Sequence, residues 1–196
     1  MNLRPELRKQ MRRQRRSLSP VERFEYAERA ARLFARTRLF RSSRHIACYW
    51  PCDGELDPLP LMQHAWARNK TCYLPVLNEL PSRRLWFAPY REGDPLVYNR
   101  FGILEPSLPV NELASAWMLD LILAPVVAFD AQGNRLGMGG GFYDRTLAFL
   151  NRRQHWHSPR LFGMAYDFQR VAYIKPAVWD VPLQGVVTEA GLYLSP

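Results

Sequence analysis

Four glycines stand within five residues, at positions 137, 139, 140 and 141, and they separate an apolar segment from an amphipathic one. Residues 118–124 are apolar except for Asp120, which predicts a buried strand, and residues 142 to about 154 predict a helix. Glycine adopts positive φ without strain and lets a ligand approach the backbone. The following helix N-terminus adds N–H donors and partial positive charge. The run therefore predicts a phosphate-binding loop between a strand and a helix.

Charged residues on both sides of this loop make the prediction more specific. Arg135 supplies a positive charge at the entrance of the loop, and Asp144 lies in the first turn of the predicted helix. A carboxylate so close to bound phosphates would repel them unless a divalent cation lay between, and Mg²⁺ takes one or two carboxylates together with phosphate oxygens. No Gly-Lys-Ser/Thr follows, and Phe142 stands where a dinucleotide fingerprint has its last glycine. Two simpler interpretations stay open: a plain connecting turn, and an aspartate that only complements the helix dipole.

Short apolar runs alternate with amphipathic segments through most of the chain. Strands are predicted at 46–50, 71–76, 85–90, 97–99, 118–124, 161–166 and 185–188, and helices at 3–16, 19 to about 40, 58–69 and 142 to about 154. Such alternation favours an α/β fold with a mostly parallel central sheet and helices on both faces, a Rossmann-like three-layer arrangement. The 196 residues fit a single domain, 1–196.

Basic charge is concentrated at the N-terminus. The formal net charge is +9, and the first 16 residues hold seven basic side chains and one acid. Leu3, Leu7 and Met11 recur every fourth residue, so this segment is predicted as a helix, 3–16. A basic helix also suits nucleic-acid binding. However, the charge is confined to one end without interleaved aromatics, and the glycine loop would go unexplained, so we expect no nucleic-acid partner.

Other features bound the cellular setting. No apolar run reaches the roughly 18 residues that a membrane helix needs, so no membrane association is expected. An odd count of three cysteines argues against a disulfide framework and favours a reducing compartment. We expect a cytoplasmic protein, and a monomer.

Several motifs occur in the order found in one enzyme family. They are the run from Ala124 to Asp130, then Gly133, Arg135-Leu136-Gly137 and the triple glycine ending in Phe142-Tyr143-Asp144-Arg145; Asp53-Gly54-Glu55-Leu56-Asp57; Phe101-Gly102-Ile103 with Glu105-Pro106; and the run from Trp179 to Leu183. Over nearly its full length the chain resembles the 5-formyltetrahydrofolate cyclo-ligases, also called methenyltetrahydrofolate synthetases. The resemblance implies ATP-dependent conversion of 5-formyltetrahydrofolate to 5,10-methenyltetrahydrofolate with release of ADP and phosphate. It implies phosphorylation of the formyl oxygen, ring closure by N10, and ATP, Mg²⁺ and a reduced folate as ligands.

The resemblance also implies roles for individual residues. The implied ATP-binding positions are Arg4, Arg8, Arg135, Leu136, Gly137, Met138, Gly139, Gly140, Gly141, Phe142 and Tyr143. The implied substrate positions are Trp50, Glu55, Phe101, Met138, Gly139, Gly140, Gly141 and Phe142. Asp144 and Asp180 are the implied magnesium carboxylates, and Arg135 and Tyr143 are the implied catalytic residues, acting by positioning and charge neutralisation.

Residue chemistry supports some of these roles and leaves alternatives for others. Arg4 and Arg8 are four apart, so both lie on one helix face and can reach one polyphosphate. A carboxylate at Glu55 suits the two parallel donors of a pterin edge. Without the resemblance, Glu55 is interpreted as a surface acid and Asp180 as a turn residue. The solvated surface charges are then Arg12, Arg13, Arg15 and Arg16. An ATP-dependent kinase or ligase acting on another small acid is the remaining alternative.

Overall fold

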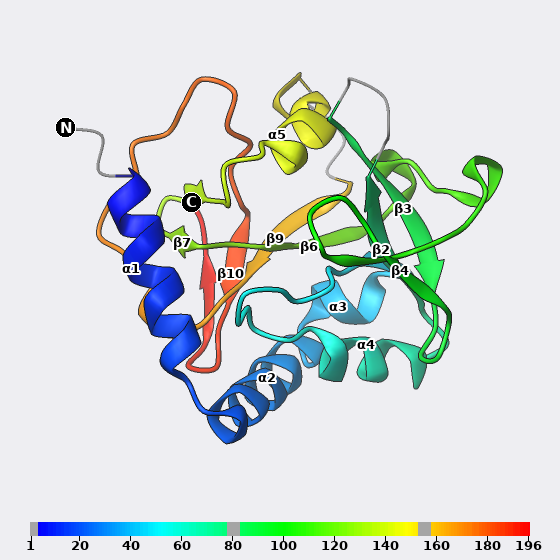
Figure 1. Ribbon diagram of the computed structural model, residues 1–196, viewed down its shortest axis with the longest axis horizontal. Coiled ribbons are helices and arrows are strands. Elements are labelled where there is room, and N and C mark those ends of the chain that lie inside the picture. Colours follow the sequence, from blue (N-terminus) through cyan, green and yellow to red (C-terminus); the bar gives the residue numbers. More distant parts are fainter. Residues whose placement is uncertain (1–3, 78–82, 153–157) are drawn as a thin grey trace.

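A seven-stranded sheet forms the centre of the molecule (Figure 1). The computed structural model describes residues 4–77, 83–152 and 158–196. The strand order is β11-β10-β9-β6-β1-β2-β3. The strands are β1 (His45–Ala47), β2 (Thr71–Leu77), β3 (Leu85–Tyr90), β6 (Leu121–Pro125), β9 (Arg160–Met164), β10 (Gly185–Val187) and β11 (Leu192–Leu194). The five inner strands are parallel, and the edge strands β3 and β11 are antiparallel to their neighbours. The predicted mostly parallel α/β sheet is confirmed.

Helices cover both faces of this sheet. On one face lie α2 (Pro20–Ala35), α3 (Arg38–Ser42) and α4 (Leu59–Trp66), and on the other lies α5 (Phe142–Leu147) with the 3-10 segments Ala116–Met118 and Ala148–Arg152. Alternate residues of β6 serve the two cores: Leu121 and Leu123 pack with the first group, Ile122 and Ala124 with the second. This period of two is the pattern of a strand buried on both faces.

Helix α1 (Arg4–Ser17) runs beside a small hairpin made of β7 (Ala128–Phe129) and β8 (Arg135–Leu136). Met11 of the predicted apolar stripe is buried there against Val127 and Leu136, and Leu7 packs beside it. The predicted N-terminal helix is therefore present over its described residues. Leu3, the first residue of the predicted stripe, lies outside them.

The predicted helix from 19 to about 40 is two helices. Its start is confirmed: the Ser19 hydroxyl accepts from the Glu22 N–H at 3.2 Å, and the Ser19 N–H donates to the Glu22 carboxylate at 2.8 Å. Its end is wrong, since α2 stops at Ala35. The Thr37 hydroxyl then accepts from the Phe40 N–H at 3.1 Å and caps α3.

Other boundaries also differ from the predictions. The predicted strand 118–124 begins only at Leu121, because a 3-10 turn precedes it and the Asp120 carboxylate accepts from the Arg44 and His45 N–H groups at 2.7 and 2.9 Å. The predicted helix 142–154 is α-helical only to Leu147, and residues 153–157 lie outside the described part. The β7–β8 hairpin, β11 and a second hairpin, β4 (Leu96–Tyr98) with β5 (Leu104–Pro106), include strands that were not predicted. The strand predicted at 85–90 is β3 with the same bounds, and the remaining predicted elements are present with shifted end residues.

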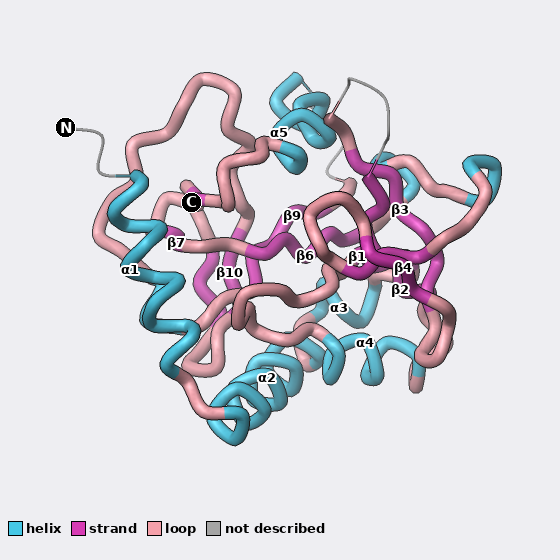
Figure 2. The backbone as a smooth tube through the Cα atoms, viewed as in Figure 1, coloured by secondary structure: helices cyan, strands magenta, loops and turns pink. Residues whose placement is uncertain are grey.

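The topology directs attention to the carboxyl ends of the parallel strands. The strands β1, β6, β9 and β10 all end on this side of the sheet (Figure 2). Long loops follow β1 and β9, and the β7–β8 hairpin follows β6 after two residues. In open α/β sheets, ligands bind outside the carboxyl ends of the strands. Among the described residues, no helix is long and apolar enough to cross a bilayer.

Candidate functional site

The glycine loop begins from the β7–β8 hairpin, and not directly from the buried strand β6 as the sequence suggested. The hairpin is held by Asp130, whose carboxylate accepts from the Gln132, Asn134 and Ile174 N–H groups at 3.0, 3.0 and 2.8 Å. Gly139 and Gly141 have φ of +101° and +64°, so both require the conformational freedom of glycine. The following helix α5 has only six residues, which limits its dipole and makes the loop backbone the main source of donors.

Helix α1 brings two arginines to the loop and its surroundings. Arg8 Nε donates to the Gly137 carbonyl at 2.8 Å, and a Cβ added at Gly139 would lie 3.8 Å from the same guanidinium. Arg4 lies one turn earlier and donates to the Asp180 carboxylate at 3.2 Å. Burial lowers the pKa of Arg8, and the nearby charge of Arg4 lowers it further. Two cations on one helix face therefore lie together, as their spacing predicted.

Arg135 is buried, although the sequence placed it at the loop entrance. It donates to the Val181 carbonyl and, at 2.5 Å, to Oδ1 of Asp144. The same Asp144 oxygen accepts from the Val181 N–H at 3.2 Å. Burial lowers the pKa of Arg135, and the adjacent Asp144 opposes that shift. Arg135 therefore orients Asp144 and ties α5 to the segment that carries Asp180.

Asp180 lies in the segment from 177 to 181, and Asp144 contacts the same segment. Asp180 Oδ2 accepts from the Ala177 N–H at 2.9 Å and from Arg4, and Asp144 uses only Oδ1 in its contacts with described residues. The described residues contain no group of three or more His, Cys, Asp or Glu side chains that could hold a metal. Two carboxylates suit a magnesium ion that completes its octahedron with phosphate oxygens and water. The donor set present therefore fits Mg²⁺ bound together with a nucleotide.

Glu55 lies in a turn that packs directly on α1. The turn follows β1 and places Asp53 and Gly54 at φ of +49° and +71°, and a Cβ at Gly54 would come within 3.2 Å of the Arg15 carbonyl oxygen. Glu55 is only 7% exposed, and its carboxylate accepts from the Cys52 N–H at 3.1 Å and from Arg15 at 3.5 Å. Burial raises its pKa, and Arg15 opposes the shift. The interpretation of Glu55 as a surface acid is wrong.

Three of the four arginines interpreted as solvated surface charges pair with the same turn. Arg15 is completely buried and donates to Asp53 at 2.9 Å, while Arg12 and Arg16 each donate to Asp53 at 2.5 Å. Burial would raise the pKa of Asp53, but these hydrogen bonds hold it below the ordinary value. The surface interpretation is wrong for Arg15. Of these four side chains, Arg13 is the one that is exposed and forms no ion pair with an acid in the described part of the chain.

Tyr143, in the first turn of α5, lies within electrostatic range of both Glu55 and Arg135. Its hydroxyl is buried and has no hydrogen-bond partner among the described residues. Burial raises its pKa, and the nearby negative charge of Glu55 raises it further, so the phenol stays neutral. A buried donor without a partner is unusual, and such a group is available to hydrogen-bond a ligand.

Aromatic side chains surround this region. The ring of Trp50 contacts that of Tyr90, with centroids 6.1 Å apart, and Phe101 meets Phe142 edge-on at 5.8 Å. Phe101 is exposed at the tip of the β4–β5 hairpin, and Met138 is 48% exposed in the loop. Leu136, in contrast, is buried against α1, so only its backbone can face a ligand.

Comparisons with known proteins place the chain in one family. A family model described as the 5-formyltetrahydrofolate cyclo-ligase family matches residues 1–189. The chain belongs to the 5-formyltetrahydrofolate cyclo-ligase family. It is therefore an enzyme of a ligase family, and the family resemblance read from its motifs is confirmed.

Relatives of this cyclo-ligase family member match most of its length. It is 38% identical to the 5-formyltetrahydrofolate cyclo-ligase of Escherichia coli strain K12 over 185 residues, 93% of this chain and 98% of the relative. It is 43% identical to the Haemophilus influenzae enzyme over 145 residues, 73% of this chain and 74% of the relative. The solved structure of Aquifex aeolicus 5,10-methenyltetrahydrofolate synthetase superposes with a TM-score of 0.79 at 31% identity, covering 98% of this chain and 92% of that one.

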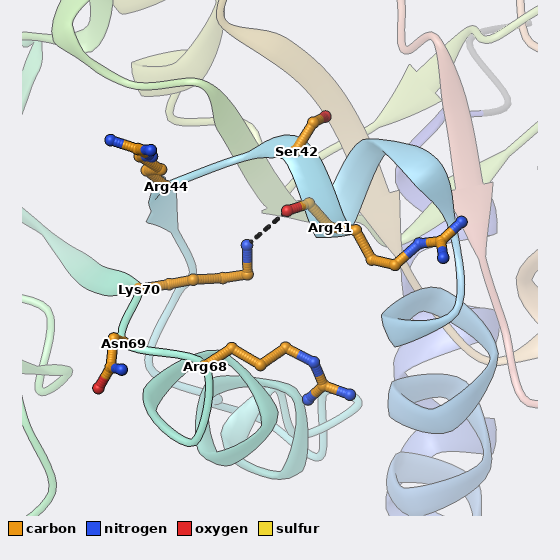
Figure 3. Close-up of a pocket in the computed structure, with 6 residues that line it drawn as sticks. All are labelled: Arg41, Ser42, Arg44, Arg68, Asn69 and Lys70. Atoms are coloured by element: carbon orange, nitrogen blue, oxygen red, sulfur yellow. Dashed lines mark hydrogen bonds between the residues drawn. The ribbon is translucent and has the colours of Figure 1, made fainter.

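A basic hollow elsewhere on this cyclo-ligase family member is separate from the predicted site. It is lined by Arg41, Ser42, Arg44, Arg68, Asn69 and Lys70 (Figure 3). These residues precede β1 and β2, so the hollow lies at the amino ends of the parallel strands. Lys70 Nζ donates to the carbonyls of Arg41 and Ser43 at 2.8 and 2.6 Å, which closes the end of α3. No residue predicted for the site lines this hollow.

Sequence reasoning missed Arg15 and Asp53, although one signal was available. Leu7 and Met11 define the apolar stripe of α1, and Arg15 is the next residue at the same spacing of four. An arginine on the buried stripe of a helix requires an acidic partner, and the Asp53-Gly54-Glu55 turn of this cyclo-ligase family member supplies two.

Proposed function

We propose that the protein converts 5-formyltetrahydrofolate to 5,10-methenyltetrahydrofolate while ATP is converted to ADP and phosphate. The observation that carries this proposal is the buried Tyr143 hydroxyl, which has no hydrogen-bond partner among the described residues and is near enough to Glu55 for that charge to raise the pKa of the phenol. The glycine loop and Arg8 offer donors for phosphate, and Glu55 offers an acceptor for a pterin. Family membership supports the same reaction.

On the nucleotide side, we propose that Arg4, Arg8 and the loop from 135 to 143 bind the polyphosphate. Arg8 uses Nε on the Gly137 carbonyl, so its terminal nitrogens are directed at the ligand by a fixed backbone contact. Asp144 and Asp180 would hold magnesium, which when bound neutralises part of the phosphate charge. Helix α1 then completes the ATP site, and the whole chain, 1–196, acts as one cyclo-ligase domain.

On the folate side, Glu55 accepts the paired N–H donors of the pterin ring. Its environment supports this role, because a buried carboxylate with one long contact to arginine gains strongly from additional donors. Trp50, Phe101 and Phe142 offer ring faces and edges for the flat substrate. Met138 and the three consecutive glycines 139–141 form the loop side of the same space.

The proposed reaction needs no nucleophilic side chain. The formyl oxygen attacks the γ-phosphorus, the bond to the β-γ bridging oxygen breaks, and ADP leaves. N10 of the folate then attacks the activated formyl carbon, loses its proton, and expels phosphate to give the methenyl cation. Arg8 and the loop N–H groups stabilise charge on the transferred phosphoryl group, and the neutral Tyr143 hydroxyl donates a positioning hydrogen bond.

An absorbance assay tests the proposal directly. Protein, magnesium, ATP and 5-formyltetrahydrofolate are mixed, and the near-ultraviolet absorbance of the methenyl product is followed. We expect absorbance to rise only when ATP and the folate are both present, and one ADP to form for each methenyl product. Well-folded protein that gives no methenyl product would sink the proposal. ATP turnover with another small acid, and none with reduced folates, would support the alternative kinase or ligase.

A further inference from the structure

Arg15 is the largest side chain that is fully buried among the described residues. A guanidinium stays charged in proteins, and a buried charge is costly unless partners surround it. Helix α1 does not need an arginine here for packing, because Leu7 and Met11 already attach it to the β7–β8 hairpin. The burial of Arg15 therefore calls for a reason beyond anchoring a helix.

The contacts of Arg15 join two acids in one turn. One terminal nitrogen donates to Asp53 at 2.9 Å and the other lies 3.5 Å from Oε1 of Glu55, while Nε has no hydrogen-bond partner among the described residues. Asp53 also receives Arg12 and Arg16, so it would keep two guanidinium partners without Arg15. Glu55 would keep none within ion-pair distance among the described residues.

Apart from Arg15, two hydrogen bonds from Cys52 favour the charged form of Glu55, one from its N–H at 3.1 Å and one from its thiol at 3.5 Å. The other titratable neighbours do not stabilise this charge: they are Asp53 in the same turn, Tyr49 just after β1, and Tyr143 in the first turn of α5. Burial raises the pKa of the Cys52 thiol to about 12, so this neighbour is neutral, and Asp53 is negative. Arg12 acts on Glu55 only from farther away. Arg15 is thus the positive group that opposes the burial of Glu55 at close range.

We propose that Arg15 is a positioning residue for the folate site, which keeps Glu55 ionised and fixes Oε1 so that the carboxylate can accept the paired donors of the pterin. This inference rests on the proposed function, since it takes Glu55 as the folate-binding carboxylate. A purely structural Arg15 would instead anchor the turn to α1 without changing the charge of Glu55.

The test measures 5-formyltetrahydrofolate affinity against pH, by calorimetry without ATP and by kcat/KM in the methenyl assay. Affinity should rise with pH as Glu55 ionises. In Arg15→Met, Glu55 loses its close positive partner, so the rise should move up by about one pH unit or more. Arg15→Lys keeps the charge but loses the planar fork, so the rise should stay near its original pH while KM increases about threefold. The KM for ATP should change little in either variant.

The matched control is Arg16→Met, which removes a guanidinium from the same Asp53 without touching Glu55. It should leave the pH of the rise unchanged. An Arg15→Met profile that coincides with wild type, or one that Arg16→Met reproduces, would overturn the inference. Should Arg15→Met fail to fold, an Arg15→Lys profile whose rise moves up by about one pH unit or more would overturn it. If the wild type binds the folate with this pH dependence and Arg15→Met shifts it, but no methenyl product forms, the proposed reaction is contradicted and the role of Arg15 is supported.

Discussion

The two sides of the glycine loop satisfy their polar groups in different ways. On the proposed nucleotide side, Arg135 meets Asp144 at 2.5 Å and Arg4 meets Asp180 at 3.2 Å. On the proposed folate side, the Tyr143 hydroxyl has no partner among the described residues, and Glu55 has its nearest arginine at 3.5 Å. The first side is organised before any ligand arrives. The second has polar groups that are incompletely paired among the described residues. A ligand with matching donors therefore gains more binding free energy there than a poorly matched ligand does.

The comparison predicts that the largest loss follows from breaking the nucleotide side at Asp144. Asp144→Asn keeps an oxygen for Arg135 and for the Val181 N–H, so the fold should persist. The lost charge removes a proposed magnesium ligand, and kcat should fall about a hundredfold or more. Steady-state turnover and a thermal melt measure the two effects. The exposed Asp94→Asn is the matched control, and equal turnover in the two variants would remove Asp144 from the site.

A smaller loss is expected at Arg8. Arg8→Met removes the guanidinium that braces Gly137, so kcat/KM for ATP should fall about tenfold, as for one charge-assisted hydrogen bond. KM for the folate should change less. Arg13→Met is the control on the same helix, because Arg13 is exposed and should be nearly neutral. Similar ATP kinetics in the two variants would contradict the role of Arg8.

At Tyr143, on the proposed folate side, a substitution should lower turnover without lowering the stability of the fold. Tyr143→Phe deletes a buried hydroxyl that has no described partner, so the free energy of unfolding should stay constant or rise by about 1 kcal/mol. Turnover should still fall about tenfold, because the hydroxyl is proposed to contact substrate. Denaturant unfolding and the methenyl assay give the two numbers. A variant that is both less stable and fully active would contradict both expectations.

The smallest effect is expected at the exposed end of the folate side. Phe101→Ala removes the ring that meets Phe142, and KM for the folate should rise about threefold with little change for ATP. Phe101→Trp, which keeps an aromatic surface, should stay close to wild type. If alanine and tryptophan have the same KM, then the ring makes no contact that matters for binding.

Local sequence patterns predicted the parts of the molecule that depend on near neighbours. The glycine loop, the Ser19 capping box and the two faces of β6 follow from residue type and spacing, and they are present. Arg15 could not be assigned this way, because it is one of four similar arginines and its partner lies about forty residues later in the sequence. The burial of Arg135 was not predicted for the same reason: it depends on a segment near Val181 that no local pattern connects to it. The resemblance implied site roles for Glu55, Asp144 and Asp180, and only the packing revealed which arginines pair with them.

Helix α1 carries Arg8 at the glycine loop and Arg15 at the Glu55 turn, seven residues and about 10 Å apart along one rigid rod. A ligand that displaces α1 at one of these residues would therefore also displace the other residue, and so change the affinity for the second ligand. Thermodynamic linkage makes any such effect reciprocal: the factor by which bound nucleotide changes the affinity for folate must equal the factor by which folate changes the affinity for nucleotide. Cooperativity between two chemically unrelated ligands would then be set by the stiffness of two helical turns.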